Sequence, residues 1–595
     1  MSHQQDSHRA WVLGAIVVLP VAAAFGSYYG SRDLLVLVYL IAAASAFAVL
    51  FVPQGESEDR FFIVLTEAIA LSLLFSTTLM SPYISGYDMN QEFQLFQQVQ
   101  QSGVWIPQIS LLYNTALSVT VLPSTVSLVS GLNGTVVFKI IYPALYSIVP
   151  VLLYKIYRRF LNPKAAFLSV FAFLAYPASY VEITQLGREM VAETLLVMLV
   201  LLLILPRIRR TRSGVLLLVM FTFGIVVSHY SLALIFLGIL VFSYILSQLS
   251  FLKSRQIGTL ASLDIISISF VAAACWFLLV AGGIVFQQLS TNLSAVISGL
   301  SDFVSPTSRA VEVTGALGLT YVSFTPLHLL NRAVQYVGVL FVLVGFMVFV
   351  HQRRQSQVTQ ILVLPTLVSM GLLLSAVILP NLSFSLNLSR IYQLSLVFLS
   401  PCFYLGATKF TSVLKRIGEH SEEDRGGQMR SNHMLPAVIL FTYLIFTSGW
   451  VWAVTGDVVP TSVVLDAKRM ANSPLNQVKA QYYDWYIVPQ DVAATIWLRS
   501  NYDPTRLVCA DLLSRYHVLT SYGGFSREGP ALNPQGRCQL RQQYVFLSYL
   551  NTVGGIGVSR TQYGSAIWPD TNTVNMVNNE NRIYSDGATI YEGFG

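Results

Sequence analysis

Residues 214–249 read GVLLLVMFTFGIVVSHYSLALIFLGILVFSYILSQL and contain no Asp, Glu, Lys or Arg. A bilayer has a hydrocarbon core about 30 Å thick, which a helix of about 20 apolar residues can cross. This stretch is too long for one ordinary span, and the more polar Ser228-His229-Tyr230-Ser231 lies near its middle. We therefore interpret it as two transmembrane helices, 214–228 and 230–249.

Similar apolar runs fill most of the chain before residue 456. The whole sequence is 54% hydrophobic and only 11% charged, with a mean hydropathy of +0.60, whereas soluble proteins are about 25% charged. We predict an all-α polytopic membrane domain over residues 1–455, in which the run from Trp11 is kept as the first helix. The predicted transmembrane helices number about thirteen and lie near 10–29, 33–53, 61–80, 136–157, 165–182, 188–206, 214–228, 230–249, 261–284, 334–351, 358–379, 391–409 and 434–455.

Basic residues gather in every second loop between these runs. Loops rich in Lys and Arg stay in the cytoplasm. We therefore expect a plasma-membrane protein whose N-terminus is cytoplasmic and whose C-terminus lies outside. The net charge of +7 is spread over these loops and does not form the single basic patch typical of nucleic-acid binding. We therefore expect the lipid bilayer as a partner and expect no nucleic acid. The segments then placed outside are 81–135, 285–333 and 456–595.

The segment 456–595 has the composition of a soluble α/β domain, which we expect to be extracytoplasmic. Pro489 is expected to open a helix over Gln490–Ser500. Arg506–Ala510 and Gln543–Tyr549 are predicted strands. Residues 581–592 predict two further short strands around an Asp586-Gly587 turn.

The four cysteines fall into two pairs by location. Cys275 and Cys402 lie inside apolar runs, where cysteine is a small apolar filler. Cys509 and Cys538 lie in the external segment and can form a disulfide in an oxidising compartment. The sequence contains no CxxC and no His/Cys cluster, so a structural zinc site is not expected.

The loop 81–135 contains two acidic residues, Asp88 and Glu92, in YDMNQEF. Four residues apart on a helix, both carboxylates lie on one face, where they can share a proton, a metal or an incoming hydroxyl. The alternative is that Asp88 caps a helix or stabilises its first turn. Amphipathic surface helices are expected over Asp88–Gln101 and Ile109–Val129.

Charged side chains at the ends of transmembrane helices are candidate functional residues because they are costly there. Arg390 has a planar guanidinium that suits a lipid phosphate, whereas Arg332 fits this role or that of an interface anchor equally well. His229 and Tyr230 could contact the same phosphate or satisfy a bent backbone. We also expect the long segment Gln287–Asn331 to cover the site as a lid. Further charged residues of this kind are Arg188, Glu189 and Glu193.

Several motifs, together with an acid pair in the first outer loop, give the sequence a resemblance to the GT-C glycosyltransferases. It is most similar to the large archaeal members related to protein O-mannosyltransferases and lipid A aminoarabinose transferases. The resemblance implies transfer of a sugar from a polyprenyl-phosphate donor to a protein, lipid or glycan acceptor, with Asp88 as the base. The motifs are Ser228-His-Tyr-Ser231, Ser389-Arg-Ile-Tyr-Gln-Leu394, Ala510-Asp511, Ser521-Tyr-Gly523, Asn581-Arg-Ile-Tyr584 and Ala588-Thr-Ile-Tyr591.

The resemblance also implies which residues would form the site. Asp88 and Glu92 would be catalytic, and no cofactor is certain. The sequence has Asp-Met-Asn-Gln-Glu rather than a plain Asp-x-Asp, so a divalent metal (Mg or Mn) on these two acids stays open. The residues expected to bind the donor phosphate are Arg188, His229, Tyr230, Arg332 and Arg390.

Other functions stay open at this point. The Trp-Trp-Asp type of motif found in oligosaccharyltransferases is absent, and Tyr482-Tyr-Asp-Trp-Tyr486 is a distant echo of it, so single-sugar transfer is favoured. A lipid or glycan transporter or flippase would suit many spans, but transporters usually carry inverted repeats and a midplane site, and neither is evident. A polysaccharide polymerase or ligase, and a non-enzymatic scaffold for surface glycans, are the remaining alternatives.

Overall fold

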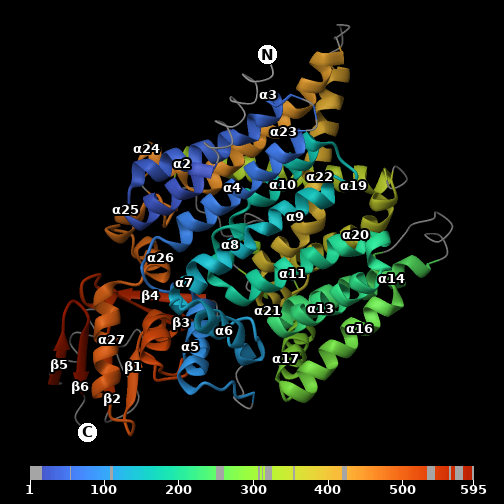
Figure 1. Cartoon of the computed structure of the whole chain (residues 1–595). Helices are drawn as coiled ribbons and strands as arrows, with labels where there is room; N and C mark the ends of the chain where they lie inside the picture. Colours follow the sequence, from blue (N-terminus) through green and yellow to red (C-terminus); the bar gives the residue numbers. More distant parts are fainter. Residues whose placement is uncertain are drawn as a thin grey trace.

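The computed structural model is mainly helical, with a small sheet region near the C-terminus (Figure 1). It describes residues 17–592 except 54, 56, 108–111, 250–259, 304, 306–307, 311–312, 315–324, 353–355, 418–424, 458, 533–542, 562–563 and 570–580.

Among the described residues, eight helical stretches are long and apolar enough to cross a membrane. Each matches one of the predicted segments, and the other five predicted segments overlap shorter helices. The protein is therefore a polytopic membrane protein, whereas the count of thirteen spans stays a prediction. The eight stretches are Arg32–Phe51, Glu58–Thr78, Gly134–Tyr157, Tyr230–Gln248, Leu263–Val280, Pro326–His351, Gln357–Ile378 and Leu388–Leu414.

Close backbone contact joins two of the long helices, α19 (Pro326–His351) and α22 (Leu388–Ile417). A Cβ atom added to Gly345 would lie 1.6 Å from the carbonyl oxygen of Cys402, and one on Gly406 would lie 1.9 Å from that of Phe341. Small residues let transmembrane helices approach in this way. The contact holds α22, which carries Arg390, firmly in the bundle.

The run 214–249 divides where the sequence predicts. Helix α13 (Arg212–Ser228) ends before His229, and α14 (Tyr230–Gln248) begins after it. The Nδ1 atom of His229 accepts a hydrogen bond from the Leu232 amide at 3.1 Å. His229 therefore caps α14 and satisfies one of its free backbone donors.

The segment 81–135 lies between the long helices and the C-terminal sheet region (Figure 1). Its first predicted helix is present as α5 (Tyr87–Ser102). The second was predicted too long. The structure shows a 3-10 turn, η2 (Leu112–Thr115), followed by α6 (Val121–Ser130), and residues 108–111 are outside the described part.

The C-terminal sheet region contains the predicted elements. Helix α27 (Pro489–Asn501) precedes a four-stranded sheet of order β1-β2-β6-β5, in which β1 and β2 are parallel and the other pairs antiparallel. Gly587, with φ of +83°, lies in the predicted turn between β5 and β6. A second sheet, β3 (Ile556–Thr561) with β4 (Gly564–Pro569), was not predicted. The four strands of the main sheet are Leu507–Ala510, Gln543–Leu547, Asn581–Ser585 and Thr589–Glu592.

The cysteines agree with the sequence as far as the structure describes them. Cys275 and Cys402 are free, and Cys509 is disulfide-bonded. Cys538, its predicted partner, lies outside the described residues.

The predicted lid segment Gln287–Asn331 begins within α17 (Ile284–Ser298). This helix is docked on the turn around α21 (Leu382–Leu386): Asn292 Nδ2 donates to the Ser385 carbonyl at 3.3 Å, and Asn381 Nδ2 donates to that of Ala295 at 2.9 Å. Residues 315–324 of the segment lie outside the described part. Its role as a lid stays a prediction.

Candidate functional site

The start of α5 is fixed by a glycine. Gly86 precedes the helix with φ of +97° and ψ of 149°, a conformation that side-chain-bearing residues rarely adopt. A Cβ atom there would also lie 2.5 Å from Gln185 Cγ. Gly86 is the N-cap residue, and no side chain caps this helix. The alternative that Asp88 caps α5 is therefore wrong, although Asp88 does lie in its first turn.

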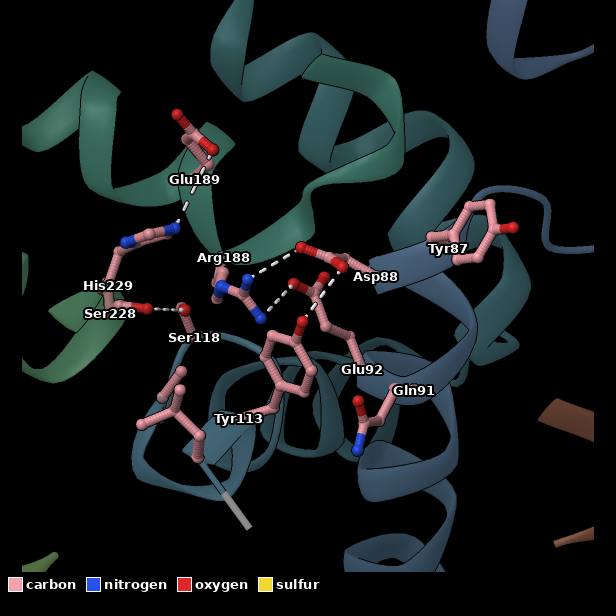
Figure 2. Close-up of polar contacts among 12 residues, drawn as sticks. Tyr87, Asp88, Gln91, Glu92, Tyr113, Ser118, Arg188, Glu189, Ser228 and His229 are labelled. Carbon is pink, nitrogen blue, oxygen red and sulfur yellow. Dashed lines mark hydrogen bonds and ion pairs between the residues drawn. The ribbon is translucent and has the colours of Figure 1, made fainter. Parts of the chain in front are cut away.

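The Asp88 carboxylate instead faces two arginines from distant parts of the chain. Its Oδ2 atom lies 2.8 Å from Arg188 Nη2 and 2.6 Å from Arg390 Nη2, and its Oδ1 accepts a hydrogen bond from Tyr113 Oη at 3.0 Å. These partners come from α11 (Gly187–Leu203), α22 and η2. Figure 2 shows Arg188 and Tyr113 converging on Asp88. Asp88 is thus paired with two arginines at once.

Glu92 lies one turn further along α5, and its carboxyl group faces the Arg188 guanidinium from the same side as that of Asp88 (Figure 2). Its side chain is fully buried, with Oε1 3.4 Å from Arg188 Nη1. A Cβ atom on Gly187 would lie 2.8 Å from Glu92 Oε2, so the glycine at the start of α11 makes room for this carboxyl group. Sequence spacing alone predicted that Asp88 and Glu92 share a face, and the structure agrees.

The two acids of α5 have different electrostatic surroundings. Burial by itself would raise the pKa of Asp88, but the guanidinium groups of Arg390 and Arg188 outweigh it and hold that pKa below its usual range. Burial raises the pKa of Glu92 to about 7, because it outweighs the attraction of Arg188. Asp88 is therefore ionised at neutral pH, while Glu92 exchanges its proton near neutrality. Such a separation is the usual way in which two carboxyl groups take different roles.

A second layer of polar residues supports the arginines. Glu189 Oε2 lies 3.5 Å from Arg390 Nε and 3.8 Å from His229 Nε2. The Arg188 guanidinium also lies against aromatic rings, with Cζ 3.8 Å from the centroid of Tyr113 and 5.7 Å from that of Tyr230. We call the set Asp88, Glu92, Tyr113, Arg188, Glu189, His229, Tyr230 and Arg390 the Asp88 cluster.

One comparison with known proteins bears on this cluster. Residues 214–591 match the model of a family described as "Predicted membrane protein (DUF2206)", which is more than half of the chain. The chain belongs to the DUF2206 family. A comparison with curated proteins found no match.

The DUF2206 match covers one part of the Asp88 cluster. His229, Tyr230 and Arg390 lie within the matched residues, whereas Asp88 and Arg188 lie before them. The cluster thus joins the matched region of this DUF2206 protein to the helices that precede it.

Glu193, another charged residue that the sequence singled out, does not join the Asp88 cluster. Glu193 lies one turn below Glu189 on α11 and accepts a hydrogen bond from Gln393 Nε2 at 2.8 Å. The same Gln393 atom donates to Tyr146 Oη at 2.8 Å. Glu193 therefore belongs to a buried polar network deeper in the helical bundle.

Arg332 is not brought to the cluster. Its Nε atom donates to Tyr336 Oη, one turn along the same helix, at 2.8 Å, and no ion pair joins it to any described residue of the cluster. Its neighbours Leu329 and Leu330 are more than half exposed, as expected on a lipid-facing surface. The contacts of Arg332 with Tyr336 fit the alternative of an interface anchor, and its role as a phosphate ligand stays a prediction.

The sequence did not indicate Arg527, which links the C-terminal sheet region to α5. Its Nη1 atom donates to Gln91 Oε1 at 2.8 Å, and its Nη2 donates to the Tyr87 carbonyl. These acceptors flank Asp88 on α5. The pairing spans more than 430 residues, so no local sequence signal could have revealed it.

The arrangement does not fit a divalent metal on Asp88 and Glu92. Both carboxylates are directed at Arg188, and a cation between them would have to displace its guanidinium. Among the described residues, no group of three or more His, Cys, Asp or Glu side chains could hold a metal ion. The chemistry below is therefore derived without one.

Proposed function

We propose that this DUF2206 protein is a membrane glycosyltransferase of the GT-C type. It would transfer a sugar from a polyprenyl-phosphate donor to a hydroxyl-bearing protein, lipid or glycan. The observation that carries the proposal is the Asp88 carboxylate held between Arg188 and Arg390. It lies on α5, the helix beside the sheet region (Figure 1). A carboxylate beside two cations offers a proton acceptor and an anion site in one place.

The two arginines suit the phosphate of such a donor. Guanidinium groups bind phosphate oxygens with paired hydrogen bonds, and the Arg390 side chain keeps 24% of its surface exposed, so a ligand can reach it. A cavity of about 180 Å³ adjoins the cluster at Tyr230, and its walls are mainly apolar. It suits the first isoprene units of a lipid tail, and its lining includes Tyr230, Leu234, Ile235, Val285, Leu289 and Leu386.

Donor binding would also activate the base. In the structure the arginines hold the pKa of Asp88 low, after offsetting the effect of burial, and a carboxylate in this state is a weak base. An incoming phosphate competes for Arg390 and Arg188, which raises the proton affinity of Asp88. The base is then strengthened when the donor is present.

The reaction would be a single displacement with inversion. The acceptor oxygen attacks the anomeric carbon while its proton passes to Asp88, and the bond from that carbon to the phosphate oxygen breaks. The electron pair leaves with polyprenyl phosphate, whose charge the arginines stabilise. Nucleotide sugars are cytoplasmic, so a site on the expected outer side requires a lipid-borne donor.

A transporter or flippase remains the main rival. In its favour are the number of apolar helices and the buried Glu193–Gln393–Tyr146 network, which lies deeper in the bundle. The enzyme is favoured because the paired charges of the Asp88 cluster gather in one place and do not form a series along a path through the bundle.

The test uses the full chain in sealed proteoliposomes with polyprenyl-phosphate hexoses labelled in the sugar, and a membrane extract as the acceptor source. The proposal expects the label to leave the lipid in a reaction that releases polyprenyl phosphate. Movement of the intact labelled lipid between leaflets without release of the sugar would support the flippase and contradict the proposal.

Arg527→Ala is expected to lower kcat by about 10- to 100-fold with little change in the KM for the donor, because Arg527 positions α5 and does not contact the donor. Arg527→Lys should recover part of the loss through one remaining bond to the Tyr87 carbonyl. The exposed Arg499 on α27 provides the matched control, Arg499→Ala. An unchanged kcat in a folded Arg527→Ala variant would show that the contact has no positioning role.

Glu92→Gln is expected to lower transfer far less than a change at Asp88 and to change the pH dependence of stability. Burial raises the pKa of Glu92 from 4.5 to about 7, so the folded protein keeps a proton that the unfolded chain loses between these values. The resulting stabilisation is complete below about pH 4.5 and is lost as the pH rises through about 7. The difference amounts to a few kcal/mol.

Thermal unfolding of the two proteins at several pH values checks this expectation. Wild-type stability should fall relative to Glu92→Gln as the pH rises, whereas Glu528→Gln, an exposed control, should follow wild type. Parallel curves for wild type and Glu92→Gln would show that Glu92 titrates normally.

A further inference from the structure

A large cavity among the described residues lies away from the Asp88 cluster. It has a volume of about 740 Å³ and runs between the turn of the first helical hairpin (27–33) and the segment 463–469. None of its lining residues belongs to the Asp88 cluster. In Figure 1 the helices that frame it, α2 (Arg32–Ala44), α25 (Ala467–Ala471) and α26 (Asn476–Trp485), lie on the opposite side of the molecule from α13 and α14. We call this cavity the hairpin groove.

Aromatic rings line the hairpin groove on both sides. Tyr482 and Tyr486 stack with ring centroids 5.2 Å apart and an angle of 17° between their planes. Tyr28 and Tyr29, on the opposite wall, are 66% and 67% exposed. Aromatic faces of this kind pack against the C–H faces of sugar rings, and their hydroxyl groups add hydrogen bonds.

A buried carboxylate oxygen in the groove lacks a partner. Asp466 lines the groove and is 2% exposed. Its Oδ1 atom accepts from Arg469 Nη1 at 2.8 Å, but its Oδ2 atom has no hydrogen-bond partner among the described residues. Leaving a buried acceptor unsatisfied costs about 1–3 kcal/mol, more for a charged group. A ligand that donates a hydrogen bond would remove this cost.

Charged side chains of both signs line the groove. Arg32 and Lys468 are at the groove, as is Asp33. Near-balanced charge does not favour a strongly ionic ligand. It favours one with many hydroxyl groups, which can donate to carboxylates and accept from guanidinium and ammonium groups.

We propose that the hairpin groove binds a neutral saccharide, with its ring faces on Tyr486, Tyr28 and Tyr29. Once the buried Asp466 side chain turns toward the groove, a hydroxyl group of the ligand donates to its Oδ2 atom. The same chemistry is offered by a free glycan chain and by the head group of a glycolipid. Val21 and Phe25, on the helix that leads into the groove, are 66% and 55% exposed, so a head group anchored in the membrane can reach it. The inference does not depend on the proposed transfer reaction.

The test uses the full chain in phosphatidylcholine nanodiscs. Its binding to an array of gluco-, galacto- and manno-oligosaccharides reports a free glycan, and native mass spectrometry of nanodiscs containing digalactosyldiacylglycerol reports a glycolipid. Binding in either arm should fall at least tenfold in Tyr486→Ala and Asp466→Asn and persist in Tyr486→Phe, which keeps the ring. Asp264→Asn, an exposed aspartate on α16 (Leu263–Ala274), is the control and should bind as wild type does.

Two further measurements keep the outcome clear. Thermal unfolding of each variant excludes loss of the fold, and we expect none in Asp466→Asn because asparagine retains an oxygen that can accept from Arg469. Binding to Tyr29→Ala, a change at an exposed position, should also be weaker than binding to wild type. The proposal is overturned if neither arm shows saccharide binding that depends on Tyr486. Selective retention of phosphatidylglycerol in place of the glycolipid would also overturn it.

Discussion

Asp88→Asn is expected to lower sugar transfer by about 10²- to 10⁴-fold, the usual contribution of a general base. Asparagine has nearly the same shape but cannot accept the acceptor's proton. The variant should fold, because Arg188 and Arg390 keep Glu92 and Glu189 as partners. Initial rates with a labelled polyprenyl-phosphate sugar measure the effect, and Asp264→Asn serves again as a matched control.

The binding of the donor separates this role from a structural one. If Asp88 is the base, Asp88→Asn should bind the donor at least as tightly as wild type, because its removal frees Arg390 and Arg188 for the phosphate. A folded variant that keeps more than half of the wild-type rate would show that Asp88 is not the base.

Arg390→Ala is expected to weaken donor binding by about 30-fold or more, because truncating one partner of a buried charge pair costs about 2–5 kcal/mol. Its fold should persist, since Asp88 keeps Arg188 at 2.8 Å and the hydrogen bond from Tyr113. Equilibrium binding of a polyprenyl-phosphate sugar to nanodisc-embedded protein measures the change.

Arg332→Ala is the matched control for Arg390→Ala. Both arginines lie near the start of a long helix, but the described hydrogen bond of Arg332 stays within its own helix. Binding should be close to wild type in Arg332→Ala. Equal losses in the two variants, or unchanged affinity in Arg390→Ala, would remove Arg390 from the donor site.

The sequence predicted those parts of the fold that depend on local patterns. The apolar runs give the positions of the helices, and the polar Ser228–Ser231 stretch marks the break between α13 and α14. Asp586-Gly587 similarly marks the last hairpin. The β3–β4 pair was missed because its strands contain Gly557 and Gly564, and glycine is depleted in strands.

The prediction of one long helix over 109–129 failed at the site itself. Tyr113 lies in the η2 turn and donates to Asp88, while Asn114 donates to the Ile106 carbonyl at 2.9 Å. These contacts replace the regular helix that the apolar spacing favours. Local rules are expected to fail where tertiary contacts build a site.

The partners within the Asp88 cluster could not be predicted from sequence. Arg188 and Arg390 lie 100 and 302 residues from Asp88, and only the packing of α11 and α22 brings them to the same carboxylate. The same limit explains why Arg332 and Arg390 looked alike. The direction in which a helical arginine points depends on the rotation of the helix, which its own sequence does not determine.

The most direct test of the central claim is an experimental structure of the protein with a bound polyprenyl-phosphate sugar analogue. The account predicts phosphate density within hydrogen-bonding distance of the Arg390 guanidinium, with the anomeric carbon of the sugar facing the Asp88 carboxylate. A lipid phosphate bound elsewhere, with a continuous polar path through the middle of the helical bundle, would contradict it.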